Sequence, residues 1–319
     1  MSEKIPKVSV VIPNYNHASY LKERIDSVLN QTYTNFELIM LDDCSTDKSN
    51  EILAEYKDHE KVSEFVINNK NSGSVFHQWE KGIHLAKGEY VWIAESDDWA
   101  EPTLLENLVN VLDGNSNVGL VSCDSVVENG TKEKSLISEY LISKYKDNRW
   151  GSYYIHSGIC ELQEVMIFNC TIGNVSSVLF RKEILLQANP FDVSLRFSGD
   201  WYCYLKVAAI SDIAYINEPL NHFRRHAKST SFKAGYNYLV ELFKIYNWLF
   251  STKIVTDKFV LNKAFHRYVS EVYYNGLRWQ PVKDIRLLLP INGSLYLKMT
   301  MKLIKRKMRS SIYLILGIK

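Results

Sequence analysis

Little in this chain of 319 residues indicates cross-linking, export or membrane insertion. Its five cysteines are widely spaced and form no CxxC pair, which argues against a disulfide framework and favours free thiols in a reducing compartment. The N-terminus lacks the basic, apolar and small-residue pattern of a signal peptide. No apolar run approaches the roughly 20 residues that a membrane-spanning helix needs. We therefore expect a cytoplasmic protein.

Acidic residues are missing from the C-terminal segment, although the composition as a whole is ordinary for a globular protein, with 46% hydrophobic and 23% charged residues. Lys298 to Lys319 contains seven Lys and Arg residues and no Asp or Glu. The rest of the chain has 31 basic and 36 acidic residues, a net charge of −5. A mildly acidic body argues against a nucleic-acid partner.

The basic segment also has apolar residues every three or four positions, at Leu297, Met301, Ile304, Met308, Ile312 and Ile315. This pattern favours an interfacial helix on an anionic membrane surface, although a helix packed on the body with a solvated basic face has the same pattern. The charge asymmetry favours the membrane. We therefore expect peripheral attachment to the cytoplasmic face of the inner membrane.

The first 125 residues alternate between short β-branched runs and segments of helical periodicity. The runs predict strands at residues 7–13, 36–41, 62–67, 89–94 and 118–122. The periodic segments predict helices at residues 18–30, 45–56, 75–86 and 102–112. This order indicates an α/β fold with a Rossmann-like, mostly parallel sheet flanked by helices. Such sheets bind ligands beyond the carboxyl ends of their strands.

The pattern is weaker after Asp124. Residues 126–160 are polar and aromatic without clear periodicity, which favours a loop or insertion over the sheet. Further along, the sequence predicts a helix at 196–210, an extended segment at 215–225 and two helices within 236–274. The chain therefore ends in a helical extension.

Acidic residues follow two of the predicted strands directly. Asp42 and Asp43 end the second strand, and Asp97 and Asp98 follow the fourth, within Glu-Ser-Asp-Asp. Crowded carboxylates repel each other unless a cation or hydrogen-bond donors compensate. A divalent cation held by carboxylates and substrate phosphates fits this arrangement. Turns and helix caps explain each acidic pair taken alone, but less readily both pairs together.

Three segments in this order resemble the family 2 glycosyltransferases: VSVVIPNYNHASYLKERIDSVLNQTY, FELIMLDDCSTDKS and KGEYVWIAESDDW. The resemblance is strong over residues 7–125 and traceable to about residue 231. It implies the GT-A fold and inverting sugar transfer from a nucleoside diphosphate donor. It also implies a catalytic domain at 1–231, with a nucleotide-binding half at 1–125 and an acceptor half at 126–231. Residues 232–319 would form the helical C-terminal extension.

The resemblance also implies roles for individual residues. Pro13, Tyr15 and Asn16 would line the nucleotide pocket, with Tyr15 stacked on the base. Asp43 would accept a hydrogen bond from the uracil ring N–H, which makes a UDP-sugar the expected donor, with GDP and dTDP as the other carriers. Asp97 would contact the ribose. Asp98 would bind Mn²⁺ or Mg²⁺, and the metal would neutralise charge on the departing diphosphate.

Two further elements of the family can be traced. Gly73 lies in a turn that family members often place near the nucleotide, although a simple glycine turn explains it equally well. Family members often continue with Ala-Arg-Asn, where this chain has His77-Gln78-Trp79. The stretch from His222 to Ser231 resembles a family element in which Arg224 would face the diphosphate and His226 would complete the metal shell, with a solvated basic edge as the alternative. We interpret the other histidines, including His17, as structural or surface residues.

Asp200, within Gly-Asp-Trp, resembles the acidic motif of the family at the start of a helix. An inverting transfer needs a general base for the acceptor hydroxyl, and a position at a helix N-terminus stabilises an ionised carboxylate. A helix cap is the structural alternative for Asp200. The acceptor is expected to be a cell-surface glycan or a lipid-linked saccharide.

Other functional classes fit the sequence less well. A sugar nucleotidyltransferase usually has a glycine-rich loop after its first strand, and residues 14–19 contain no glycine. A dinucleotide-dependent oxidoreductase would need G-x-G-x-x-G after a strand, which this chain lacks. A non-catalytic glycosyltransferase-like subunit remains as an alternative, but the combination of Asp43, Asp98 and Asp200 argues against it.

Overall fold

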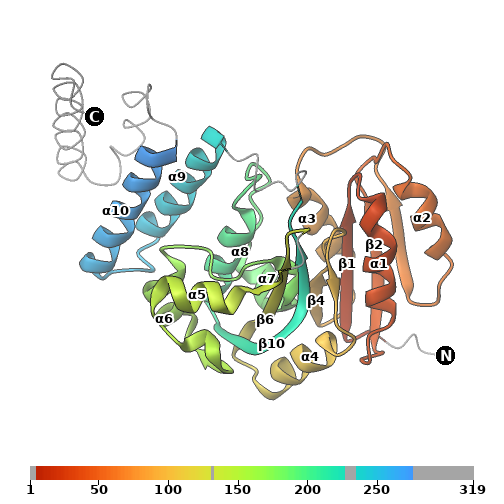
Figure 1. Cartoon of the computed structure of the whole chain (residues 1–319), viewed down its shortest axis with the longest axis horizontal. Helices are drawn as coiled ribbons and strands as arrows, with labels where there is room; N and C mark the ends of the chain where they lie inside the picture. Colours follow the sequence, from red (N-terminus) through yellow and green to blue (C-terminus); the bar gives the residue numbers. More distant parts are fainter. Residues whose placement is uncertain (1–4, 131–132, 227–234, 276–319) are drawn as a thin grey trace. The chain divides into compact units, whose positions relative to one another are not determined.

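The computed structural model describes residues 5–130, 133–226 and 235–275 (Figure 1). The chain divides into two compact units, with the division between Ala234 and Gly235. Among the described residues, no helix is both long enough and apolar enough to span a membrane. The basic segment that we expect to contact a membrane, residues 298–319, lies outside the described residues.

Within the described ranges, the first unit carries the strands and most of the helices. Its strands are β1 (Val8–Asn14), β2 (Phe36–Asp42), β3 (Val62–Ile67), β4 (Tyr90–Ile93), β5 (Trp99–Ala100), β6 (Val118–Glu128), β7 (Ser135–Leu136), β8 (Tyr154–His156), β9 (Val178–Arg181) and β10 (Asp212–Arg224). Its α-helices are α1 (Ala18–Leu29), α2 (Ser49–Tyr56), α3 (Val75–Leu85), α4 (Leu104–Gly114), α5 (Ile137–Tyr145), α6 (Gly158–Glu161), α7 (Lys182–Ala188) and α8 (Gly199–Ala208). Short 3₁₀ turns at Arg149–Gly151 and Val175–Ser177 and a π turn at Leu162–Met166 complete it.

The strands form one sheet in the order β3-β2-β1-β4-β9-β6-β10-β5, and outside this order β7 pairs with β6 and β8 pairs with β10. β1 pairs in parallel with β2 and β4, and β10 pairs in parallel with β6. The predicted mostly parallel sheet is therefore confirmed. The exceptions are β9, which is antiparallel to both β4 and β6, and the short strands β5, β7 and β8, which are antiparallel to β10, β6 and β10.

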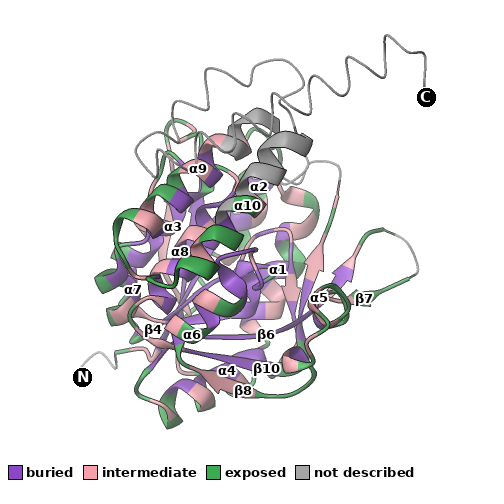
Figure 2. Ribbon diagram, turned by 90° about the vertical axis from the view of Figure 1, so that its left-hand side faces the viewer, coloured by how far each residue is buried: buried purple, intermediate pink, exposed green. Residues whose placement is uncertain are grey.

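Successive apolar side chains of β1 point to opposite faces of the sheet, so both faces are hydrophobic and are covered by helices. Every residue of β1 is buried, as expected for a central strand with layers on both sides. Val10 and Ile12 belong to a hydrophobic cluster with Leu21 and Ile25 of α1. Val11 faces the other way, toward α3, where a Cβ at Gly82 would lie 2.3 Å from its Cγ1. Figure 2 shows buried residues concentrated in the strands and the inner faces of the helices.

Several element boundaries differ from the sequence predictions. Residues 126–160 are not one loop, because they contain α5, β8 and α6. The second predicted helix begins at Ser49, not at residue 45, since the intervening residues turn around the end of β2. In the second unit, α9 (Gly235–Ser251) and α10 (Lys258–Asn275) match the two predicted helices.

Candidate active site

A cleft of about 610 Å³ lies at the carboxyl ends of β1, β2 and β4. The parallel pairing of these three strands brings segments that are far apart in the sequence to one edge of the sheet. Of the residues predicted for the site, six line this cleft: Pro13, Tyr15, Asn16, Asp43, Gly73 and Asp97. Asp98, Asp200, Arg224 and His226 are not among its lining residues.

The turn after β1 presents an aromatic ring to the cleft. Tyr15 is 46% exposed, so its ring is available to a ligand. The next residue, Asn16, has a positive φ of 57°, a conformation that asparagine tolerates better than most residues. Its Oδ1 accepts a hydrogen bond from the backbone N–H of Thr46 at 2.8 Å. Asn16 therefore shapes the loop that carries Tyr15.

Asp43 is buried at the end of β2 and holds together the turn that follows β3. Its Oδ1 accepts hydrogen bonds from Asn68 Nδ2 at 2.7 Å and from Gln78 Nε2 at 2.9 Å. Ser72 donates to the same carboxylate through its backbone N–H and, at 2.7 Å, through its hydroxyl group. The turn continues to Gly73, whose φ of +83° lies in the region that favours glycine.

Glu95 is the first residue of the acid loop, which we define as residues 95–98. Its Oε1 accepts a hydrogen bond from Trp79 Nε1 at 2.7 Å, and the side chain lines the cleft. Burial and the negative charges of Asp97 and Asp98 raise the pKa of Glu95 to about 8. The protein therefore carries a carboxyl group that is largely protonated at neutral pH beside two other acids.

Asp97, His17 and His226 form a cluster whose candidate ligand atoms all lie within 4.8 Å of one another. Asp97 Oδ2 and His226 Nε2 are 3.0 Å apart, and the His17 and His226 rings meet edge to face. Burial opposes ionisation of Asp97, but the hydrogen bond from His226 and the nearby His17 outweigh it, so the pKa of Asp97 lies below its ordinary value. One carboxylate and two imidazoles form a ligand set that can hold a divalent transition-metal ion, Mn²⁺ among them.

Asp98 faces away from this cluster and is only 1% exposed. Its Oδ2 accepts hydrogen bonds from Asn174 Nδ2 at 2.6 Å and Ser176 Oγ at 2.7 Å, and its Oδ1 accepts one from the backbone N–H of Arg224 at 3.0 Å. Burial and the charge of Asp97 raise the pKa of Asp98 to about 6. We expected Asp98 to bind the metal and Asp97 to contact the ribose, whereas the geometry places Asp97 beside the histidines.

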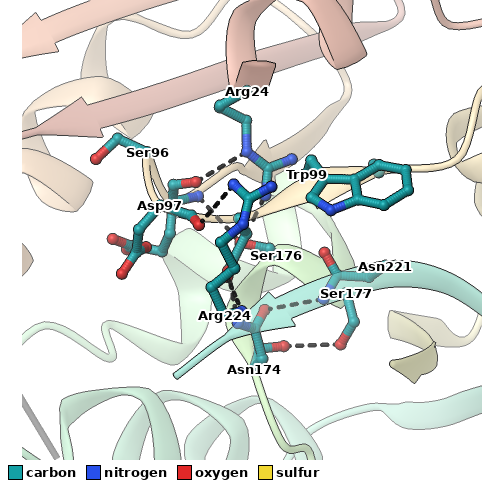
Figure 3. Close-up of polar contacts among 12 residues, drawn as sticks. Arg24, Ser96, Asp97, Trp99, Asn174, Ser176, Ser177, Asn221 and Arg224 are labelled. Carbon is teal, nitrogen blue, oxygen red and sulfur yellow. Dashed lines mark hydrogen bonds and ion pairs between the residues drawn. The ribbon is translucent and has the colours of Figure 1, made fainter. Parts of the chain in front are cut away.

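Two arginines hold the acid loop from different elements (Figure 3). Arg24 of α1 is fully buried and donates from Nε to the carbonyl oxygen of Glu95 at 2.8 Å. Burial lowers the pKa of Arg24 to about 10 against the opposing effect of Asp98. Arg224 donates to the carbonyl oxygen of Asp97 at 3.3 Å and forms an ion pair with Glu23 at 2.6 Å. The guanidinium of Arg224, expected at a diphosphate, is thus engaged with the acid loop and α1.

Asp200 lies in the first turn of α8, as the sequence predicted. Its Oδ1 accepts a hydrogen bond from the backbone N–H of Trp201 at 2.7 Å, and Trp201 Nε1 is fixed by the carbonyl oxygen of Met166 at 2.8 Å. The preceding Gly199 allows close packing, since a Cβ there would lie 2.5 Å from the ring of Phe76. Asp200 therefore sits on a firmly held helix start that directly follows two cleft residues, Arg196 and Phe197.

Sequence reasoning missed three residues of this site. His17 was interpreted as structural, but it belongs to the cluster with Asp97. Its position, four residues after Pro13 at the end of a strand, was a usable signal. Glu95 and Gln78 also line the cleft. Gln78 gave a weaker signal, since it stands only as a departure from the family pattern.

A family model described as "Glycosyl transferase family 2" matches residues 9–170. An uncharacterized glycosyltransferase from Rickettsia typhi is 30% identical over 267 residues, which cover 84% of this chain and 79% of the relative. The glycosyltransferase GlyG from Streptococcus pneumoniae is 28% identical over 233 residues, which cover 70% of this chain and 72% of GlyG.

Solved structures resemble the fold at lower sequence identity. The crystal structure of Staphylococcus aureus TarS 1-349 in complex with UDP-GlcNAc has a TM-score of 0.69 at 17% identity and covers 91% of this chain and 82% of that one. The mannosyltransferase PcManGT from Pyrobaculum calidifontis, in complex with GDP-Man and Mn²⁺, has a TM-score of 0.51 at 17% identity. It covers 99% of this chain and 89% of its own.

Proposed function

Since this chain belongs to the family 2 glycosyltransferases and has their GT-A fold, we propose that it is an inverting, metal-assisted enzyme that transfers a sugar from a nucleoside diphosphate donor. A saccharide hydroxyl of a cell-surface glycan or a lipid-linked precursor is the proposed acceptor. The observation that carries the donor site is the cluster of Asp97, His17 and His226 beside a cleft lined by Tyr15 and Asp43.

Within this proposal, the cleft at the ends of β1 and β2 receives the nucleotide. The exposed ring of Tyr15 offers a stacking surface for a base, and the glycine turn at Gly73 leaves room close to the backbone. TarS is in complex with UDP-GlcNAc and PcManGT with GDP-Man, which supports a donor with one of these carriers, and we propose UDP first. We assign the nucleotide to residues 1–125 and the acceptor to residues 126–231.

The metal site in this proposal uses Asp97, His17 and His226, and not Asp98. A carboxylate and two imidazoles are ligands that Mn²⁺ accepts, and Mg²⁺ is the alternative where carboxylate and phosphate oxygens dominate. PcManGT in complex with Mn²⁺ supports a divalent metal. The metal would supply positive charge where the leaving diphosphate gains negative charge. Asp98 anchors the loop that presents Asp97.

We propose Asp200 as the general base that accepts the proton of the attacking hydroxyl group. The N-terminal turn of α8 favours an ionised carboxylate. The hydrogen bond from the Trp201 backbone fixes one carboxylate oxygen. Peripheral membrane attachment through residues 298–319 stays a prediction, and deletion of the segment after residue 294 with unchanged membrane partitioning would contradict it.

The first experiment is a thermal-shift panel of UDP, GDP, dTDP and CDP, each with Mn²⁺ and with EDTA. A ligand at one hundred times its Kd stabilises the native state by about 2.7 kcal/mol, which is readily measured. We expect one nucleotide to stabilise the protein in Mn²⁺ only, and expect Asp97→Ala to remove that effect.

Asp200→Asn separates binding from catalysis. We expect this variant to bind the same nucleotide as the wild type, while slow hydrolysis of the matching nucleotide sugar falls by about 10²-fold or more. The absence of stabilisation by every nucleotide would favour the non-catalytic alternative. Equal hydrolysis by Asp200→Asn and the wild type would remove Asp200 from the proposed mechanism.

A further inference from the structure

Gln78 offers an unused hydrogen-bond acceptor beside the nucleotide cleft. It lies on α3, is 3% exposed and lines the cleft together with Tyr15 and Asp43. Its Nε2 donates to Asp43 Oδ1 at 2.9 Å, whereas its buried Oε1 has no hydrogen-bond partner among the described residues. Buried polar atoms are nearly always paired, so an unpaired one in a cleft points to a ligand.

The orientation of the Gln78 amide is fixed by chemistry. The two ends of a glutamine amide look alike, and their assignment depends on the hydrogen-bond network. Here the neighbour is the carboxylate of Asp43, which accepts hydrogen bonds from three other groups and has no proton to donate when ionised. The NH₂ end of Gln78 must therefore face Asp43, which leaves the carbonyl oxygen as the free end.

Asp43 itself has little capacity left to accept a hydrogen bond from a nucleobase. A carboxylate has about four lone-pair sites, and Asn68, Gln78 and the two donors of Ser72 already occupy Asp43. The carboxylate thus organises the turn after β3 and orients Gln78. Among the described residues that line the cleft, Asn14 Oδ1 and Gln78 Oε1 are both buried acceptors without a partner, and Gln78 is the one whose amide is held against Asp43.

We propose that Gln78 is a specificity-determining residue whose carbonyl oxygen accepts a hydrogen bond from the ring N–H of the donor nucleobase. The inference rests on the proposed function, because it requires that a nucleoside diphosphate occupies this cleft. Uracil and thymine carry this hydrogen on N3, and guanine carries it on N1. Cytosine and adenine present a lone pair at the same ring position, which would face the lone pairs of Gln78 Oε1. The site therefore selects bases with a protonated ring nitrogen.

Two ring-matched pairs of nucleotides test this selection: UDP against CDP, and IDP against ADP. Within each pair, the ring system is the same, and an oxo group with a ring N–H replaces an amino group with a ring lone pair. Kd is measured by isothermal titration calorimetry with Mn²⁺ present. We expect the wild type to bind UDP at least about tenfold more tightly than CDP, because CDP leaves the buried acceptor of Gln78 unpaired. For the same reason, we expect IDP to bind more tightly than ADP if purines bind.

Gln78→Met keeps the length of the side chain and removes its amide, so we expect the UDP-to-CDP ratio to fall to about threefold or less. Gln31→Met is the matched control, because Gln31 is also buried but has both ends of its amide paired, with Ser27, Glu101 and Leu105. It is expected to retain the wild-type ratio. Gln78→Asn, which shortens the side chain and withdraws the carbonyl oxygen, serves as a second variant if Gln78→Met does not fold.

The outcomes separate this inference from the function on which it rests. If UDP, CDP, IDP and ADP all fail to bind, the proposed nucleotide site is wrong. If UDP and CDP bind the wild type equally, the site does not read the ring nitrogen, and the inference is overturned. It is also overturned if Gln78→Met keeps the wild-type selectivity, or if Gln31→Met loses it to the same extent.

Discussion

Replacement of Asp98 by alanine tests whether the last acid of the acid loop anchors the fold or binds the metal. In the structure, three donors would lose their acceptor: Asn174 Nδ2, Ser176 Oγ and the backbone N–H of Arg224. Each buried donor without a partner costs about 1–3 kcal/mol. The charge of Arg24, whose guanidinium lies 4.0 Å from Asp98 Oδ2, would also lose its nearest counter-charge.

Part of this loss is offset, because burial already disfavours the ionised form of Asp98. The rise of its pKa from 3.8 to about 6 corresponds to roughly 3 kcal/mol at neutral pH. We therefore expect Asp98→Ala to lower the free energy of unfolding by roughly 2–4 kcal/mol. For a unit of this size, that change lowers Tm by roughly 5–15 °C.

The assay is thermal unfolding in EDTA, where metal binding makes no contribution. Asp97→Ala is the matched control, since the Asp97 carboxylate contacts His226 and the residue lines the cleft. We expect Asp97→Ala to lower Tm by only about 3 °C and to lose Mn²⁺ binding, as measured by calorimetry. An Asp98→Ala variant with the wild-type Tm in EDTA would refute the anchoring role, and an Asp97→Ala variant that binds Mn²⁺ normally would refute the ligand assignment.

Three further changes test other parts of the site and the fold. The pKa of Glu95 is raised from 4.5 to about 8, so ionisation of this side chain destabilises the folded state. In EDTA, the wild type should therefore lose stability relative to Glu95→Gln as the pH rises from 4.5 to 8. Urea unfolding should show the difference between the two proteins change by roughly 3–5 kcal/mol between pH 4.5 and pH 8, and a difference independent of pH would contradict this. His17→Ala should weaken Mn²⁺ binding at least about tenfold in calorimetry, whereas the exposed His59→Ala should not. Gly82→Ala should destabilise the protein by about 1–3 kcal/mol, because its Cβ would lie 2.3 Å from Val11 Cγ1, and an unchanged Tm would contradict that contact.

The sequence predicts the central parallel strands well because their burial is dictated locally. β1, β2 and β4 are short buried runs that follow and precede clear helical periodicity, and their parallel order requires the crossover helices between them. β9 could not be placed in this way. It is a short strand of four residues that inserts antiparallel between β4 and β6, and only its long-range pairing defines it.

The two aspartates of the acid loop show where local sequence stops being informative. Asp97 and Asp98 are neighbours of one residue type, so the sequence gives no preference for which of them faces the cleft. The partners that decide are remote: Asn174 and Ser176 take Asp98 inward, and His226 meets Asp97. These contacts join segments separated by 76 to 129 positions in the chain.

The contacts of Arg224 explain why Asp98 lies buried beside Asp97, the proposed metal ligand, although burial disfavours the charge of Asp98. Its backbone N–H donates to Asp98 Oδ1 while its guanidinium donates to the carbonyl oxygen of Asp97. The end of β10 is therefore fastened to the acid loop at two points, and His226 follows only two residues later, with Nε2 3.0 Å from Asp97 Oδ2. Asp98 thus fixes the position of His226 relative to Asp97 through the backbone. The two proposed ligands Asp97 and His226 are 129 positions apart in the chain, and this anchor holds their segments together, which gives Asp98 a functional reason to be buried and charged.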